Sequence, residues 1–539
     1  MFLMIQTTSN LNNFIKKRKG LPILLKKHLE KVATIFVLIM FTLYNYIFTP
    51  GYRYYEFVKY TVFVSLLLLS LFLMIIISIV YRITQPKWAL RTINEYLHNI
   101  YIWEYSLMVY LFIGFISALH SDNPLYAFIG LSARNEGWLI LACYAITFFM
   151  VSRSYQPRIR DFIIFAISCS ILALYGIGQY FGFDPLNLGK DIEIFTHKYL
   201  INFYATLSNT NAASALLTLC LMISSVLFMK LRTPKKWIFF ICILIVFMVL
   251  CLGKTESGMV GMIISFLLIF PFLVKNKNNA FSMFLLLGSL LSLYWIYLCI
   301  YAFTALPAQG NPSPTWLELR TNPFLWGAIA SFILSLLFFA FRNKKMGFTI
   351  SQKIWQRVWW LSLLIIAIGF ILLLPTIEKM TSSRTIKQLS EIMQGNIQDS
   401  MGSNRIYVWR RALKIYEEHP FLGVGPDRFY AYFVRDYGAE SLALYNFHFD
   451  KAHSEYLQTL VDMGPFALIS LFSFYGLLLF KAKNYIENPL ILSVIAALLC
   501  FLIQAFFNFS QPISTPVVWV IWGILGALIR NENTINSDN

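Results

Sequence analysis

The residues best suited to chemistry lie between Pro375 and Gly464, the one long polar stretch in an otherwise apolar chain. Arginine forks bind phosphate oxygens through paired hydrogen bonds, and a histidine near its neutral pKa takes a proton from a hydroxyl. Together these groups favour chemistry on a phosphorylated substrate. The alternative is a solvated, headgroup-facing set of arginines with incidental histidines. The candidate groups are Arg405, Arg410, Arg411, His448, Asp450, His453 and Glu455.

Two helices are expected to carry these groups. Residues 403–418 place Ile406, Trp409 and Leu413 at steps of three to four, which is one face of an amphipathic helix. Pro420 ends this helix, and the glycines at 423 and 425 allow a tight turn. A second helix is predicted over 452–463, up to the break at Gly464 and Pro465.

A metal site formed by His448, Asp450 and His453 is a further alternative, but their spacing fits no standard ligand motif. The seven cysteines all fall within apolar runs and have no partner at zinc-ligand spacing. They are typical of small core residues. No metal and no cofactor is therefore expected.

The composition is that of a membrane protein. The chain has 539 residues, of which 58% are hydrophobic and 13% charged, about half the usual charge of a soluble protein. Apolar runs long enough to cross a bilayer, roughly 17–25 residues each, predict an all-α polytopic protein with about 14 transmembrane helices. The runs are 32–50, 60–81, 100–120, 136–152, 161–181, 209–229, 236–252, 256–274, 280–303, 323–341, 358–375, 465–480, 489–508 and 513–529.

These runs divide the chain into five parts. Residues 1–31 form a basic N-terminus that stays as an uncleaved anchor with the first span. About 11 helices follow over 32–375, then a mostly helical extracytoplasmic loop over 376–464. The last three spans occupy 465–530, and a short polar tail occupies 531–539.

The basic residues indicate orientation. Lysines and arginines concentrate in alternate connections, for example 82–91, 153–160, 230–236 and 342–357, while the opposite short connections carry few. This alternation follows the positive-inside rule, so both termini are expected in the cytoplasm and the long loop outside, in the cytoplasmic (inner) membrane. Because topology accounts for most of the formal charge of +18, no nucleic-acid partner is expected.

Polar residues also occur at the predicted external ends of several spans. They suggest a cavity shared with the long loop, because ionisable groups at membrane depth are costly and usually face a cavity or each other. The alternative, weighed equally, is interfacial anchoring and helix capping. The residues are Arg134, Asn209, Asn211, Lys254 and Glu256.

The pattern resembles the O-antigen ligase and polymerase (Wzy-type) superfamily, which includes bacterial O-oligosaccharyltransferases. The resemblance rests on an Arg with a Trp four residues later, a Pro-x-x-Gly-x-Gly-Pro turn and an Ala-His-x-Glu-Tyr-Leu segment that ends in Gly. It spans roughly residues 105–530. The matching positions are Arg405, Trp409, Pro420, Gly423, Gly425, Pro426, His453, Glu455, Tyr456, Leu457 and Gly464, with the 134–137 and 204–211 segments earlier.

Two positions depart from the family pattern. Ser454 stands where the family usually has Asn. Residues 255–258 read Thr-Glu-Ser-Gly where many members carry Ser/Thr-Arg-Gly, so in gapless register Glu256 replaces an arginine. Either Lys254 takes over a phosphate contact, or Arg134 and Arg405 suffice, or the activity is altered.

The resemblance implies a GT-C-like membrane enzyme that performs metal-independent, inverting glycosyl transfer in cell-surface polysaccharide biosynthesis. The donor would be a glycan on a polyprenyl diphosphate, and the acceptor a hydroxyl of a glycan, lipid or protein. It implies that Arg405, Arg134 and Arg411 hold the diphosphate, with Asn209, Asn211 and Lys254 lining the substrate site. His453 would be the general base, oriented by Glu455 or Asp450.

Two other functions remain open at this stage. A flippase or other transporter of lipid-linked oligosaccharide is compatible with about 14 spans, although a transporter concentrates ionisable residues within its spans. A non-enzymatic membrane scaffold gives no reason for Arg405 and His453 to share one loop.

Overall fold

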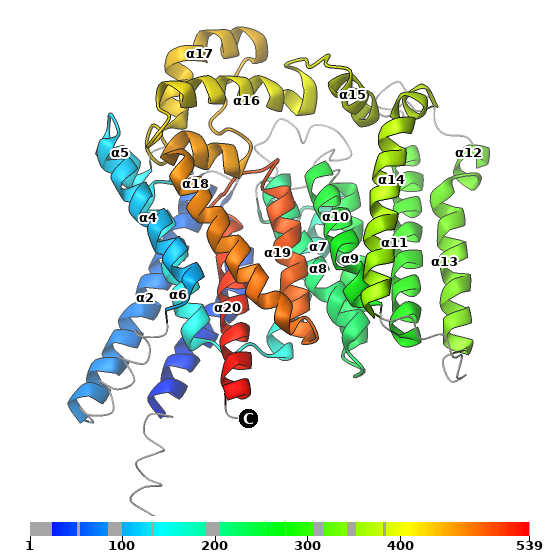
Figure 1. Ribbon diagram of the computed structural model, residues 1–539, viewed down its shortest axis with the longest axis horizontal. Helices are drawn as coiled ribbons and strands as arrows, with labels where there is room; N and C mark the ends of the chain where they lie inside the picture. Colours follow the sequence, from blue (N-terminus) through cyan, green and yellow to red (C-terminus); the bar gives the residue numbers. More distant parts are fainter. Residues whose placement is uncertain are drawn as a thin grey trace, which may run out of the picture.

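The chain folds into a bundle of long apolar helices with a smaller helical layer over one end (Figure 1). The computed structural model describes residues 24–50, 54–84, 100–130, 134–188, 205–207, 209–253, 255–274, 276–304, 316–341, 352–380 and 384–537. Within these ranges the regular elements are all helices. The prediction of an all-α polytopic membrane protein is thereby confirmed.

The helices follow one another with short connections. A first candidate span covers Leu24–Tyr46. The others are α2 (Tyr55–Thr84), α4 (Ile102–His120), α5 (Pro124–Ile129), α6 (Trp138–Ser154), α7 (Ile159–Tyr180), α8 (Thr210–Lys230), α9 (Lys236–Leu252), α10 (Glu256–Leu273), α11 (Lys277–Thr304), α12 (Trp316–Arg320), α13 (Pro323–Ala340), α14 (Gln352–Met380), α15 (Arg384–Met393), α16 (Met401–Glu418), α17 (Phe429–Tyr445), α18 (Glu455–Ala482), α19 (Pro489–Gln504) and α20 (Thr515–Ser537).

Ten helices of the described chain are long and apolar enough to cross a membrane. Helices suit this environment because they satisfy every internal backbone hydrogen bond within one segment. Three shorter apolar helices, α6, α9 and α19, pack among them. The expected count of about 14 spans stays a prediction.

The helices differ strongly in how deeply they lie within the bundle. In α8, 94% of the most apolar window is buried, whereas in α14 only 6% is. α8 packs against α9 and α19, while α6 packs against α20 and α4 against α18. α8 is therefore a core helix, and α14 is a rim helix that presents its side chains to lipid.

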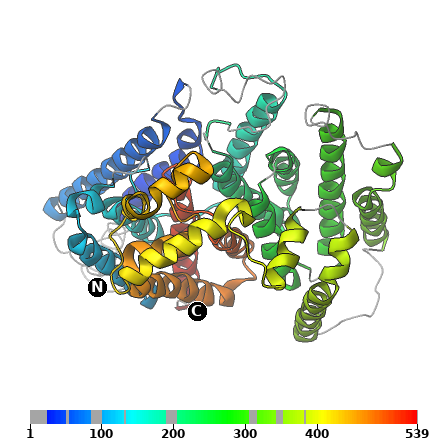
Figure 2. The ribbon, with the colours of Figure 1, turned by 90° about the horizontal axis from the view of Figure 1, so that it is seen from above.

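The layer at the end of the bundle has an apolar core of its own. α16 and α17 cross above the spans (Figure 2). They enclose Tyr407, Phe433 and Phe449, each less than 5% exposed, with Ala412 and Val461 beside them. This core is separate from the core of the bundle. It gives the layer a defined shape on which polar side chains can be held.

A tight turn fastens this layer to α18. Gly423 and Gly425 have φ values of 67° and 106°, which confirms the predicted glycine-dependent turn. The amides of Val424 and Gly425 donate to the carbonyls of Val461 and Asp462 at 3.0 and 2.8 Å. α18 is then interrupted at Gly464, with φ 79°, as expected. A Cβ at Gly464 would lie 2.0 Å from the Phe421 carbonyl oxygen, so only glycine fits.

Candidate active site

Arg405 stands at the true beginning of α16. Residues 402–404 have left-handed φ values of 60°, 57° and 67°, so the predicted helical start at Ser403 is wrong and regular helix begins at Arg405. The Arg405 Nη1 donates to the Gly402 carbonyl at 2.9 Å, and its Nε donates to the Phe507 carbonyl at 3.1 Å. Two backbone carbonyls thus fix the guanidinium and leave further N–H donors for a ligand.

His453 lies in the loop before α18 rather than on the helix. The predicted helical start at Ala452 is wrong, because the Ser454 hydroxyl caps the helix by accepting from the Leu457 amide, so the helix begins at Glu455. His453 itself has φ 52°, an uncommon conformation for a non-glycine residue. Its imidazole packs edge-on against Phe509, with ring centroids 5.1 Å apart.

Arg134 reaches the same place from the loop before α6. Its Nε donates to Asp450 Oδ2 at 2.7 Å, and its Nη1 donates to Gln511 Oε1 at 3.0 Å. The guanidinium lies over the Phe509 ring, 4.7 Å from the centroid, so Phe509 contacts both Arg134 and His453. The three predicted residues Arg134, Arg405 and His453 are therefore brought together from segments up to 319 positions apart (453 − 134).

The charges around His453 set its protonation. Burial, together with the positive charges of Arg405 and Arg134, lowers the pKa of His453 to about 4, and Asp450 opposes this shift. Burial works against ionisation of Asp450, but its contact with Arg134 outweighs burial and lowers the Asp450 pKa. At neutral pH the site consequently holds two guanidinium cations, one carboxylate and a neutral imidazole that can accept a proton.

The connection between α19 and α20 organises this cluster, and the sequence did not draw attention to it. Within seven residues it supplies the Phe507 carbonyl, the Phe509 ring and Gln511 as partners for the arginines and His453. Its Ser510 amide also donates to Glu455 Oε2 at 2.6 Å. Glu455 is therefore bonded to this connection, and the charged group that acts on His453 is Asp450. The only available signal was the polar run Asn508 to Gln511 between two apolar spans.

A second cluster missed in the sequence lies next to the site. The Lys451 ammonium, 2% exposed, contacts Asp427 Oδ1 at 2.6 Å and Glu136 Oε2 at 3.2 Å. Burial raises the pKa of Glu136 to about 8 against the opposing charge of Lys451. For Lys451, burial lowers the pKa, but Asp427 and Glu136 outweigh it and the net change is upward. This cluster ties the α6 loop, the 423–428 turn and the His453 loop together.

The remaining predicted binding residues have different surroundings. Arg411 contacts Asp399 at 2.5 Å and Glu440 at 2.7 Å and stacks on Tyr407, so the structure does not bring it to Arg405. Asn209 caps α8 by accepting from the amides of residues 211 and 212, which is the capping alternative considered above.

Asn211 and Glu256 lie nearer to the cluster. Asn211 lines a small cavity with Glu455 and Gln511, about 20 Å³ in volume and large enough for a water molecule. The negative charge of Glu256 raises the pKa of Arg405, opposing the lowering by burial. Lys254 lies outside the described residues. Among the residues that are described, no group of three or more His, Cys, Asp or Glu side chains could hold a metal ion.

Comparison with known proteins supports a function for the end of this segment. No curated protein has a significant match to the chain. Residues 325–472, however, match the family described as O-antigen ligase. The matched segment runs from α13 into α18 and contains Arg405 and His453, while Arg134 and Gln511 lie outside it. The match supports placing this chain in the O-antigen ligase and polymerase superfamily, as a multi-pass membrane protein of polysaccharide biosynthesis.

Proposed function

We propose that the protein transfers a glycan from a polyprenyl-diphosphate carrier to an acceptor hydroxyl at the outer face of the cytoplasmic membrane. The observation that carries this proposal is the convergence of Arg134, Arg405 and His453 at the end of the bundle beneath α16. In the proposed orientation this end is extracytoplasmic and both termini are cytoplasmic. The cluster then lies where the diphosphate of a membrane-embedded carrier would lie.

Arg405 and Arg134 are the proposed diphosphate ligands. Both guanidinium groups are oriented by protein acceptors, and Arg405 is largely buried, so little reorganisation accompanies charge development. A preorganised donor of this kind contributes about 2.7–4 kcal/mol to transition-state stabilisation. The arginines would stabilise the diphosphate as it leaves with the electron pair of the broken glycosidic C–O bond.

His453 is the proposed general base. The acceptor hydroxyl oxygen attacks the anomeric carbon from the face opposite to the diphosphate, so the configuration inverts, and the hydroxyl proton passes to the imidazole. In the free protein the low pKa keeps the imidazole neutral. An anionic diphosphate beside it would raise its pKa again, because a nearby opposite charge favours the protonated form. Donor binding would thus strengthen the base when it is needed. No step requires a metal ion or cofactor.

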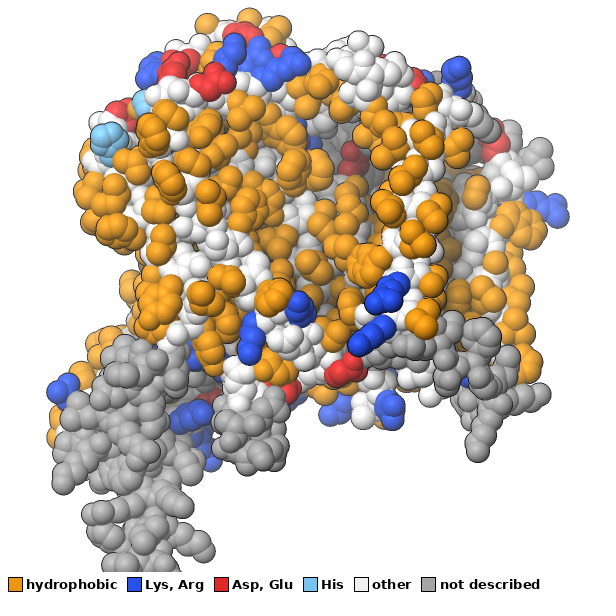
Figure 3. All heavy atoms as spheres, in the orientation of Figure 1, with side chains coloured by type: hydrophobic (Ala, Val, Ile, Leu, Met, Phe, Trp, Pro, Cys, Tyr) orange, Lys and Arg blue, Asp and Glu red, His pale blue; other side chains and the backbone are white. Residues whose placement is uncertain are grey.

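The shape of the molecule offers a route for the polyprenyl chain. The surface is hollowed between α19 and α14, below the layer that carries α15 and α16 (Figure 3). On the rim helix α14, apolar side chains such as Leu364, Ile365 and Leu372 are 56–73% exposed. We place the polyprenyl chain in this lateral opening, with its diphosphate directed toward Arg405.

Deletion of the gene followed by analysis of surface glycans tests the function and separates its variants. Loss of chain length with retained attachment identifies a polymerase. Accumulation of an intact lipid-linked polymer that never reaches its acceptor identifies a ligase. If lipid-linked glycan instead accumulates on the cytoplasmic face, the protein is a transporter and the proposal is wrong.

A further inference from the structure

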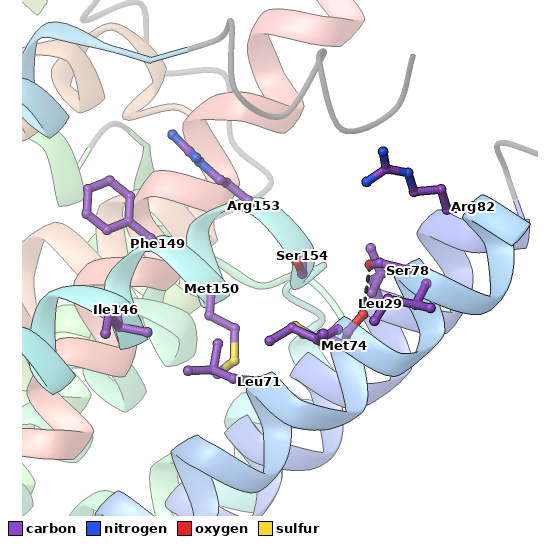
Figure 4. A pocket seen from close by; sticks show the side chains of 12 residues that line it. Leu29, Leu71, Met74, Ser78, Arg82, Ile146, Phe149, Met150, Arg153 and Ser154 are labelled. Atoms are coloured by element: carbon purple, nitrogen blue, oxygen red, sulfur yellow. Dashed lines mark hydrogen bonds between the residues drawn. The ribbon is translucent and has the colours of Figure 1, made fainter. Parts of the chain in front are cut away.

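A second lipid-facing feature lies at the opposite end of the bundle from α16 and α17. A groove of about 440 Å³ runs between α2, α6 and the first candidate span (Figure 4). Its walls are mostly aliphatic and aromatic side chains, and Ile75 and Ile79 are 56% and 50% exposed. No Asp or Glu is among the twelve lining residues, but Arg82 and Arg153 are.

The two arginines stand at one end of the groove. Arg82 is in the last turn of α2, and Arg153 is in the last turn of α6. From Leu71 to Arg82, the α2 side of the groove extends over about 16 Å at 1.5 Å per residue. Half of a bilayer's hydrocarbon core is about 15 Å thick. The groove therefore has the length of one leaflet, with its positive charge at the level of the lipid headgroups.

Arg153 is held firmly in place at this end. Its Nη2 donates at 3.1 Å to Glu104, a fully buried carboxylate that Arg530 also contacts at 2.7 Å. The Arg153 guanidinium lies 5.3 Å from the Phe149 ring centroid. Arg82, by contrast, is exposed and sits on the other wall. A fixed cation and an adjustable cation flanking an apolar groove can close on a phosphate group from two sides.

We propose that this groove binds an anionic phospholipid from the leaflet opposite to the α16–α17 layer. An acyl chain would lie along α2 and α6, and the headgroup phosphate would lie between Arg82 and Arg153. Basic pockets between transmembrane helices on the cytoplasmic side bind anionic headgroups in this manner. The site is remote from Arg405 and His453, and its lipid is a bound structural ligand rather than a substrate.

Native mass spectrometry of the purified full-length protein tests this proposal. The protein is equilibrated in micelles that contain either phosphatidylglycerol or phosphatidylcholine, and the retained lipid is counted. We expect selective retention of phosphatidylglycerol, with about a fivefold weaker apparent affinity in Arg82→Gln, because each basic residue near a headgroup is worth about 1 kcal/mol. Size-exclusion chromatography checks that each variant is folded.

Two further variants separate a built site from diffuse attraction. Arg357→Gln is the matched control: Arg357 is an exposed arginine near the start of α14, at the same end of the bundle but away from the groove (Figure 1). It should retain phosphatidylglycerol as the unmodified protein does. Met74→Trp, which fills the groove without changing charge, should lower retention. Equal retention of the two lipids, equal effects of Arg82→Gln and Arg357→Gln, or full retention by folded Met74→Trp would each overturn the proposal.

Discussion

Arg405→Ala is expected to reduce glycan transfer about 10²–10³-fold. The structure gives the reason, since the Arg405 side chain is largely desolvated and already oriented by the carbonyls of Gly402 and Phe507. Loss of one such preorganised donor to a developing oxyanion costs about 2.7–4 kcal/mol. Because this charge develops on the leaving diphosphate, the loss should fall on kcat more than on KM. Arg405→Lys should recover only part, since an ammonium on a flexible stem lacks the planar fork.

The assay is the initial rate of transfer from a polyprenyl-diphosphate glycan by purified protein, over a range of donor concentrations. Arg410→Ala is the matched control: it removes the same charge from the next turn of α16, where Arg410 is 50% exposed and contacts Asp399 at 2.7 Å. That variant should stay within about twofold of the unmodified protein, because exposed ion pairs contribute little. Near-normal kcat in a folded Arg405→Ala protein would refute the role assigned to Arg405.

Three other outcomes are expected. Because the pKa of His453 is about 4 rather than its ordinary 6.5 and the neutral imidazole is the active form, kcat/KM should rise with pH through about 4 and be level near 6.5; the limb for kcat should lie higher, since bound diphosphate raises that pKa. A limb in kcat/KM near 6.5 would contradict this. Lys451→Met leaves buried Asp427 and Glu136 without their cation, and should destabilise the fold by about 3–5 kcal/mol, measured by thermal inactivation against the exposed Lys414→Met. Glu256→Arg should retain transfer, and an inactive but folded variant would show that this carboxylate has its own task.

The sequence predicted the membrane architecture well because hydropathy is a local property. Each apolar run reports its own environment, without knowledge of its neighbours. The interruption of α18 was also predictable, because Gly464 followed by Pro465 is a local backbone signal. The two misplaced helix starts have local causes as well. Left-handed residues precede Arg405, and the Ser454 cap excludes His453 from α18.

The arrangement of the site could be predicted only in part. Arg405 and His453 stood out because they share one polar loop, but their relation to Arg134 depends on tertiary packing. Lys451 looked like an ordinary loop lysine, since its partner Glu136 is 315 positions away (451 − 136). The contributions of Phe507 and Phe509 were invisible, because one acts through its backbone carbonyl and the other through a ring that resembles any apolar residue.

The most direct test of the proposed mechanism is glycan transfer by purified protein from a defined polyprenyl-diphosphate donor, with the configuration of the new glycosidic bond determined by NMR. We expect the unmodified protein to form an inverted linkage and release polyprenyl diphosphate. His453→Ala should bind the donor but form no product. A retained configuration, or a normal rate in the folded His453→Ala protein, would contradict the mechanism.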